Sequence, residues 1–388
     1  MPIVAKTGNE AMAEAMRQIN PDVVAAYPIT PATEIVMIFS TYVADGLVDT
    51  EFVAVESEHS AMSATLGASA SGIRAMTATS SQGLVYMSEL LPIVSALRLP
   101  IVMPEVNRTI SGPINIHCDH SDTMAMRDYG WIHIFSEDAQ EAYDNVLQAI
   151  KIAENSEVML PAMATTDGFI ISHCMQKIEI LDDAEVKKYV GEYQPKTNLL
   201  DFKNPVTIGS LDLQDFYFEH KRPVAEAMKK AKQVILDVGK EFGKKCGREY
   251  GFFEKVQLDD AEAAIVCLGS TAGTAKAVVE KMRKEGKKVG LLKLRVFRPF
   301  PAEEIANELK HVKSIAIMDR CEGLNAYGAP LFNEIRSAMY DVSPKPKIVN
   351  FIYGLGGRDI GLNEIEGIYN DLLKGTTKEL VNYIGCRE

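Results

Sequence analysis

The sequence predicts an α/β protein with two domains, each built on a largely parallel sheet. Its 388 residues exceed the length of one average domain. Short apolar runs alternate with longer amphipathic ones, which is typical of strands joined by crossover helices. This alternation weakens between residues 170 and 222 and then begins again. We therefore expect one domain with its connecting region over residues 1–245 and a second domain over residues 255–388.

In the first domain, six apolar runs have the length and composition of buried strands. They cover residues 23–27, 51–55, 73–79, 99–106, 131–135 and 158–165. The amphipathic stretches between them are expected to form helices. A long amphipathic helix, from residue 223 to about residue 245, should follow the connecting region.

The second domain repeats the alternation on a smaller scale. Strands are expected at residues 263–270, 288–297, 312–320 and 346–354. Helices are expected from residue 271 to about residue 285, near Ala302 and at the end of the chain. The glycines of GSTAG and GLGGRD are expected to form turns, because neither run has the full G-x-G-x-x-G dinucleotide pattern.

Composition excludes several classes of function. The chain has 41 Lys and Arg against 53 Asp and Glu, a net charge of −12, and no long basic run, which disfavours nucleic-acid binding. The most apolar window, residues 88–106, is interrupted by charges and by three prolines, so no membrane span is expected. The N-terminus lacks the features of a targeting segment, which predicts a cytoplasmic protein. Six cysteines without a C-x-x-C pair predict no zinc or iron–sulfur site on this chain.

Polar side chains follow four of the predicted strands at the point where each strand ends. Because ligands of open α/β sheets bind outside the carboxyl ends of the strands, these side chains are expected around one crevice. In chain order they are Thr30, Glu58, the run Ser81, Gln82 and Gly83, and Arg108.

Two of these strand ends also fit an ordinary helix start. Thr30 suits a helix N-cap with Pro31 at the first helical position, and capping alone explains such a pair. Ser57 is expected to cap the next helix, which places Glu58 in its first turn. If small neighbours bury it, Glu58 has the environment of an acid/base group. If it faces solvent, its negative charge only interacts favourably with the positive N-terminal end of the helix dipole.

Arg108 and the loop that follows it also have two interpretations. The planar guanidinium of Arg108 fits a carboxylate, although an Arg after a strand is commonly a surface residue. The segment HCDHSD, residues 117–122, contains metal-ligand types. No second ligand group follows it, so a loop lining the crevice is favoured over a metal site.

These motifs, taken in order, resemble a known family. YPITP (27–31), VESEHSA (55–61), TATSSQG (77–83), and Arg108 followed by DHSD are similar to the α subunits of 2-oxoacid:ferredoxin oxidoreductases, most of all those of the pyruvate enzyme. The resemblance extends through LRVFRPFP (294–301) and YGLGGRD (353–359), and so covers nearly the whole chain.

The resemblance implies an enzyme that uses thiamine diphosphate and coenzyme A to convert a 2-oxoacid, in the pyruvate enzyme pyruvate, into an acyl-CoA, CO2 and reduced ferredoxin, reversibly. It implies that Glu58 hydrogen-bonds the pyrimidine ring of the cofactor and promotes its activation. It also implies that Thr30 and Arg108 bind the substrate carbonyl and carboxylate. The cofactor-binding residues implied by these motifs are Pro28, Ile29, Glu58, Ser81, Gln82 and Gly83.

The resemblance also implies partner chains. The G-D-G pattern that holds Mg2+ and the diphosphate is absent here, as are cluster cysteines. A β subunit is expected to supply Mg2+, the diphosphate site and an iron–sulfur cluster, and γ and δ subunits and ferredoxin complete the system. The first domain would be of the pyrimidine-binding type of thiamine enzymes, and the second would resemble the C-terminal domain of transketolases and serve assembly.

Three further interpretations stay open from the sequence. The substrate is a branched-chain or aryl 2-oxoacid in one of them, because such enzymes share these motifs. In the second, the chain is a non-catalytic scaffold subunit of an electron-transfer complex. In the third, it belongs to a thiamine enzyme without iron–sulfur clusters.

Overall fold

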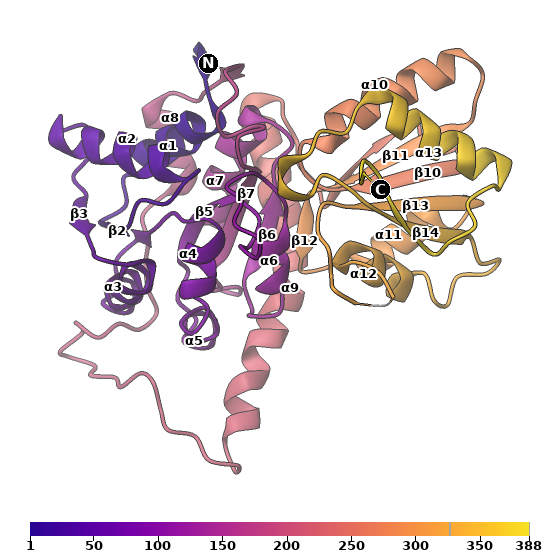
Figure 1. Cartoon of the computed structure of the whole chain (residues 1–388). Helices are drawn as coiled ribbons and strands as arrows, with labels where there is room; N and C mark the ends of the chain where they lie inside the picture. The colour runs from indigo at the N-terminus through magenta and orange to yellow at the C-terminus, as the bar shows by residue number, and fades with distance from the viewer. Residues whose placement is uncertain (326, 388) are drawn as a thin grey trace.

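The computed structural model describes residues 1–325 and 327–387. Two α/β units lie side by side, each with helices on both faces of a sheet (Figure 1). The α/β fold class with two parallel-sheet units is therefore confirmed.

The first sheet has seven strands, and all neighbours in it are parallel except at the β12 edge. The six strands predicted for this unit all form, with somewhat different bounds. In spatial order the strands are β12 (Val296–Arg298), β6 (Ile132–Phe135), β7 (Ala162–Asp167), β5 (Val102–Asn107), β4 (Ala75–Met76), β2 (Val23–Ala26) and β3 (Glu51–Ala54).

Two apolar cores cover the two faces of this sheet. Alternate residues of β5 point to opposite faces: Val102 and Val106 belong to one core, and Met103 belongs to the other. The larger core contains side chains of α1 (Gly8–Ile19), α2 (Thr33–Ala44), α7 (Ala139–Ala153), α8 (Asp183–Val190) and α9 (Tyr217–Cys246). The smaller core contains side chains of α3 (Glu58–Ala70), α4 (Ser81–Tyr86) and α5 (Leu91–Ala96).

The second sheet has six strands and a similar layered arrangement. In spatial order they are β15 (Val381–Tyr383), β14 (Lys347–Ile352), β13 (Ser314–Asp319), β10 (Ala263–Cys267), β11 (Val289–Leu294) and β9 (Phe253–Val256). One face packs against α10 (Thr271–Lys284) and α13 (Leu362–Lys374), and the other against α11 (Ala302–Leu309) and α12 (Pro330–Ala338). A 3-10 turn, η1 (Leu355–Gly357), follows β14.

The single strand predicted at residues 288–297 is wrong, because the chain changes sheets inside it. β11 pairs with β9 and β10 in the second sheet, whereas β12 pairs antiparallel with β6 in the first. Arg295 stands at the crossing and is 2% exposed. Its guanidinium donates to Asn145 and Gln148 of α7 and to the carbonyl of Gly251, at 2.8, 3.1 and 3.1 Å. The two units are therefore joined by a chain segment that passes directly from one sheet to the other and by a buried polar network.

The region between residues 170 and 222 has more structure than its sequence indicated. It contains β8 (Gln176–Glu179), which pairs antiparallel with β1 (Ile3–Lys6), and also α8. Helix α9 begins at Tyr217, six residues before the predicted start, and Pro223 lies inside it.

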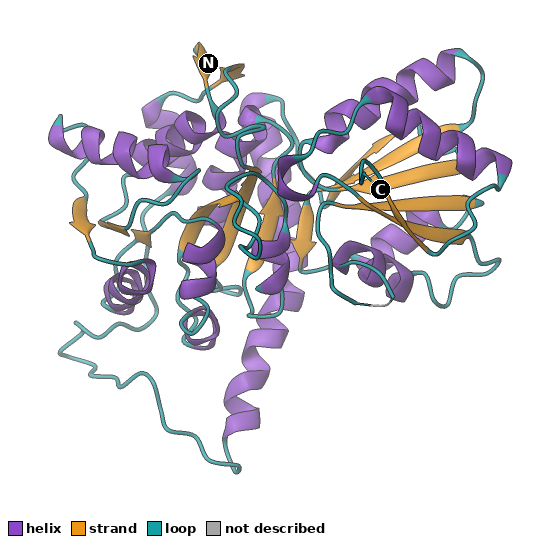
Figure 2. Ribbon diagram, in the orientation of Figure 1, coloured by secondary structure: helices purple, strands orange, loops and turns teal. Residues whose placement is uncertain are grey.

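Residues 191–216 contain no helix or strand. Figure 2 shows them as a loop that extends away from the body and returns to the N-terminal end of α9. Two large apolar side chains of this arm, Phe202 and Leu211, are 84% and 91% exposed. Within the described residues, no helix has the length and apolar character needed to cross a membrane.

Arg295→Ala should lower the free energy of unfolding by about 3 to 5 kcal/mol, because it leaves two amide side chains and a carbonyl without a charged donor. Urea unfolding followed by circular dichroism measures this. Arg336→Ala, at an exposed position on α12, is the matched control and should change stability by less than about 0.5 kcal/mol. Equal effects of the two substitutions would contradict the role of the Arg295 network.

Candidate active site

The four polar strand ends lie at one edge of the first sheet. β5, β4, β2 and β3 are consecutive parallel neighbours, so their carboxyl ends face the same side. The predicted strand-end residues therefore lie along one edge of the sheet.

Thr30 and Arg108 are in direct contact. The Arg108 guanidinium donates to the carbonyl of Thr30 at 3.0 Å and to the carbonyl of Asn115 at 3.2 Å. Arg108 is 8% exposed, and burial lowers its pKa, although the nearby Asp122 carboxylate opposes that shift. Two strand ends that are 78 residues apart in the chain therefore form one polar surface.

The predicted capping role of Thr30 is wrong. Helix α2 begins at Thr33, its N-cap is Ala32, and no side chain caps it. Thr30 is exposed, and its hydroxyl makes no hydrogen bond within the described residues. This hydroxyl is therefore available to a ligand beside the Arg108 guanidinium.

The carboxylate of Asp122 holds the strand ends in place. One oxygen accepts hydrogen bonds from the backbone amides of Arg108 and Ser81, at 2.9 and 3.1 Å. The other accepts from the Asn107 side chain and the Thr123 amide, at 2.9 and 2.8 Å. Asp122 is fully buried. It therefore fixes the ends of β5 and β4 relative to each other.

Ser81 adopts a backbone conformation that is costly for a residue with a side chain. Its φ is +48°, in the left-handed region. Its amide donates to Asp122, and its hydroxyl donates to the carbonyl of Thr109 at 2.7 Å and contacts the side-chain oxygen of Gln82 at 2.7 Å. Such strain persists only where the surroundings hold it, and it is concentrated at ligand sites.

Glu58 is buried beside Gly83. The Ser57 hydroxyl caps α3 as predicted, accepting from the Ser60 amide at 3.2 Å, which places Glu58 in the first turn. Glu58 is 8% exposed, and its carboxylate has no hydrogen-bond partner within the described residues. A Cβ at Gly83 would lie 2.9 Å from its Oε1 and 2.4 Å from the Thr79 hydroxyl. Glycine at position 83 therefore leaves room for this carboxylate.

A second buried carboxyl, Glu105, lies behind the strand ends. It is fully buried in β5, and burial, together with the nearby Asp122 carboxylate, raises its pKa well above the usual range. Burial and the like charge of Asp122 therefore both disfavour the charged form of Glu105.

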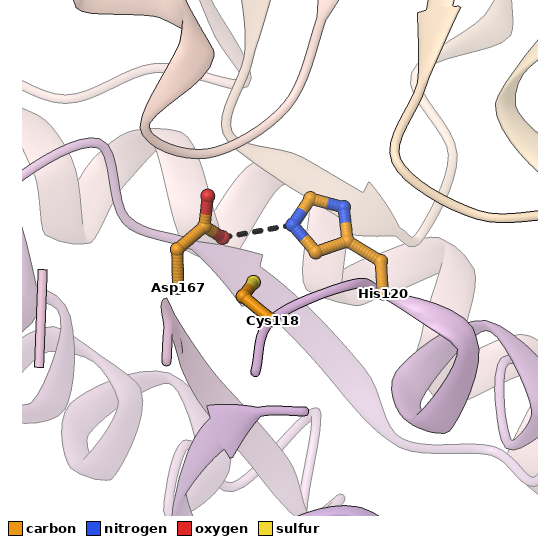
Figure 3. A group of neighbouring side chains, drawn as sticks. All are labelled: Cys118, His120 and Asp167. Carbon is orange, nitrogen blue, oxygen red and sulfur yellow. Dashed lines mark hydrogen bonds and ion pairs between the residues drawn. The ribbon is translucent and has the colours of Figure 1, made fainter. Parts of the chain in front are cut away.

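The loop at residues 117–122 contributes to a polar contact between the two units. The His120 Nε2 atom hydrogen-bonds to an Asp167 carboxylate oxygen at 2.8 Å, with the Cys118 thiol beside them (Figure 3). Asp167 also accepts from the Ser270 amide at 3.1 Å and lies 3.9 Å from Arg320. Its pKa is strongly lowered by these neighbours, His120 first, against the opposing effect of burial. The Asp167 charge is therefore already matched by protein groups.

The residues predicted from the sequence lie at the strand ends, but sequence reasoning missed the residues that support them. The structure joins Thr30 to Arg108 directly, and joins Arg108 to Ser81 through Asp122. Glu58 lies beside Gly83, two residues after Ser81. The missed supports are Asp122, Asn115 and Glu105, and only Asp122 lies within one of the sequence motifs.

Comparison with known families matches both units. Residues 14–240 match the family described as pyruvate flavodoxin/ferredoxin oxidoreductase, thiamine diphosphate-binding, and residues 261–365 match pyruvate:ferredoxin oxidoreductase core domain II. Pyruvate synthase subunit PorA of Thermotoga maritima is 53% identical, covering 99% of this chain and 98% of that protein. The PorA subunit of Methanocaldococcus jannaschii is 45% identical, covering 98% and 97%. Ketoisovalerate oxidoreductase subunit VorA of Pyrococcus abyssi is 42% identical, covering 95% and 93%.

Two solved structures share the fold. 2-Oxoglutarate:ferredoxin oxidoreductase from Magnetococcus marinus aligns with a TM-score of 0.75 at 19% identity, over 96% of this chain and 65% of that chain. A split-gene transketolase aligns with a TM-score of 0.53 at 12% identity, over 95% and 98%. The chain belongs to the family of α subunits of pyruvate:ferredoxin oxidoreductases.

Proposed function

We propose that this chain supplies the pyrimidine side of a thiamine diphosphate site and the carboxylate-binding group for a 2-oxoacid, with pyruvate as the substrate. The assembled enzyme would convert pyruvate and coenzyme A into acetyl-CoA, CO2 and reduced ferredoxin, reversibly. The observation that carries this proposal is the buried, unpartnered Glu58 carboxylate at the same sheet edge as the Thr30–Arg108 pair.

The surroundings of Glu58 fit the pyrimidine ring of the cofactor. A buried carboxylate without a protein partner is unfavourable unless a ligand supplies a hydrogen bond. Glu58 meets this description, and Gly83 beside it has no side chain to block the approach of a ring. Pro28, Ile29, Ser81 and Gln82 would line the same cofactor site.

The bound thiamine diphosphate would act as the electron sink for decarboxylation. Glu58 would hold a proton between its carboxyl group and a ring nitrogen, as an acid/base group does. Arg108 would pair with the substrate carboxylate, and the Thr30 hydroxyl would donate to the substrate carbonyl. A charge-assisted pair of this kind contributes about 1.5 to 3 kcal/mol, which is one to two decades in affinity.

Partner chains would complete the site. A β subunit would hold Mg2+, the diphosphate and an iron–sulfur cluster, and γ and δ subunits would contact ferredoxin, all in the cytoplasm. The arm at residues 191–216 supports such an assembly, because its exposed Phe202 and Leu211 resemble an apolar interaction surface.

A branched-chain 2-oxoacid is the second candidate substrate. The 42% identity to a ketoisovalerate oxidoreductase subunit favours it over an aryl 2-oxoacid.

A panel of 2-oxoacids, assayed with the assembled enzyme, separates pyruvate from the branched-chain acid. The highest kcat/KM should be with pyruvate. A higher kcat/KM with 2-oxoisovalerate would reverse the assignment.

Glu58→Gln should lower kcat for pyruvate-dependent viologen reduction by at least about 100-fold, because the amide cannot exchange a proton with the ring nitrogen. The measurement uses the complex assembled with its partner subunits. Glu51→Gln, at the opposite end of β3 and exposed, is the control and should keep near-normal activity. Near-normal turnover of the Glu58 variant would remove it from the mechanism.

Arg108→Lys should raise the KM for pyruvate about tenfold, because lysine keeps the charge but loses the planar fork. The KM values for coenzyme A and ferredoxin should stay within twofold. Arg336→Lys, on the exposed face of α12, serves as the control. An unchanged KM for pyruvate would argue against carboxylate binding at Arg108.

A further inference from the structure

The segment between β5 and α6 (Ser121–Ala125), called here the Arg108 loop (residues 108–120), contains no helix or strand. It includes Gly112 and Pro113, and Ile114 near its tip is 82% exposed. The position of Arg108 depends on this loop, because the Arg108 Nε donates to the carbonyl of Asn115 at 3.2 Å. The contacts that hold Asn115 in place therefore also affect the position of Arg108.

The first part of the loop is held by its own domain. The carbonyl of Thr109 accepts from the Ser81 hydroxyl at 2.7 Å, and the amide of Ile110 donates to the Ser121 hydroxyl at 2.9 Å. The amide of Thr109 also donates to the carbonyl of His117 at 3.0 Å, which closes the neck of the loop. None of these bonds involves Asn115.

The second part of the loop is held by the other domain. The Asn115 side chain donates to the carbonyl of Gly356 at 3.1 Å, and the amide of Gly357 donates to the carbonyl of Cys118 at 2.7 Å. The amide of Gly356 donates to Asp119 at 3.4 Å. These bonds come from residues 354–357, called here the glycine turn, which contains η1 and follows β14.

The glycine turn requires glycine at both contact positions. Gly356 and Gly357 have φ values of +60° and +80°, which side chains disfavour. A Cβ at Gly356 would lie 2.5 Å from the Asn115 side-chain nitrogen, and a Cβ at Gly357 would lie 2.4 Å from the His117 Cβ. A side chain at either position would therefore clash with the Arg108 loop, and glycine allows the two backbones to pack together.

We propose that the glycine turn of the second domain is a positioning element for substrate binding: it holds Asn115, and through the Asn115 carbonyl it orients the Arg108 guanidinium toward the substrate carboxylate. This inference rests on the proposed carboxylate-binding role of Arg108. It gives the second domain a part in substrate recognition in addition to assembly. Neither the glycine turn nor Asn115 needs to touch the substrate.

The test compares the KM for pyruvate with kcat in the assembled enzyme. Gly357→Ala should raise the KM for pyruvate about tenfold, while kcat falls less than threefold and the KM for coenzyme A stays within twofold. Asn115→Ala removes the side-chain link to Gly356, together with the hydrogen bond that the Asn115 side chain accepts from the His117 amide at 2.7 Å. It should raise the KM for pyruvate about threefold, and it is the variant to measure if Gly357→Ala fails to assemble. A Kd for oxamate, a pyruvate analogue that keeps the carboxylate, should rise by the same factors.

Gly375→Ala is the matched control. Gly375 has a φ of +68° in the same domain, but a Cβ there would meet nothing within 4 Å. The Gly375→Ala substitution imposes similar backbone strain without touching the Arg108 loop. The KM of this variant for pyruvate should therefore stay within twofold of the unmodified enzyme. A KM that rises equally in Gly357→Ala and Gly375→Ala, or a loss confined to kcat and thermal stability, would overturn the proposal.

A double substitution separates this inference from the proposed function. In an Arg108→Lys background, Gly357→Ala should add less than twofold to the KM for pyruvate, because the group that it positions has already been changed. A full additional tenfold rise would overturn the inference. If Arg108→Lys weakens binding and Gly357→Ala and Asn115→Ala do not, the inference fails and the proposed function stands. If Arg108→Lys has no effect, the proposed function itself fails.

Discussion

The buried carboxylate of Asp122 is the interaction on which the arrangement of the site depends. Parallel strands bring their carboxyl ends to one edge, but they do not fix how the chain leaves each strand. Asp122 does so for β4 and β5 by accepting from the amides of Ser81 and Arg108 with a single oxygen. Because burial makes an unpaired donor costly, both amides are held by this one acceptor. Burial raises the pKa of Asp122, and the hydrogen bonds that its carboxylate accepts from the Arg108 amide and the Asn107 side chain oppose that shift.

The two domains are joined in two physically different ways. At one place they share backbone pairing, where the chain crosses from β11 to β12 and Arg295 satisfies amide and carbonyl groups around the crossing. At the other place they share hydrogen bonds to irregular backbone: the glycine turn meets the Arg108 loop, the His120 amide donates to the carbonyl of Arg320, and the Ser270 amide donates to Asp167. The first connection passes directly from one sheet to the other. The second brings residues of the second domain into contact with the Arg108 loop.

The strand ends of the candidate site carry polar groups that the chain leaves without protein partners. Glu58 is 8% exposed and its carboxylate has no hydrogen bond within the described residues, the exposed Thr30 hydroxyl has none there either, and Ser81 is held in a strained conformation. A carboxylate with little access to water gains when a ligand supplies a hydrogen bond, and backbone strain of this kind is concentrated at ligand sites. The exposure of apolar side chains in residues 191–216 to water is unfavourable for the isolated chain. Contact with another subunit would bury these side chains, which agrees with an assembly of several subunits.

Local sequence patterns were enough to predict the fold class, most strands of both sheets and the four strand ends of the candidate site, because periodicity and strand-end chemistry are local properties. They missed β9, β12 and β15, which are short strands at the sheet edges. They also placed Ser57 as a helix cap but misplaced the start of α2, since a Thr-Pro pair fits a cap and a free loop equally well. Three features became visible only in the folded chain: Asp122 accepts from two strand ends, residues 288–297 divide between two sheets, and Gly356 meets Asn115. These contacts join residues as far as 241 positions apart, and no local pattern records which distant backbone groups become neighbours.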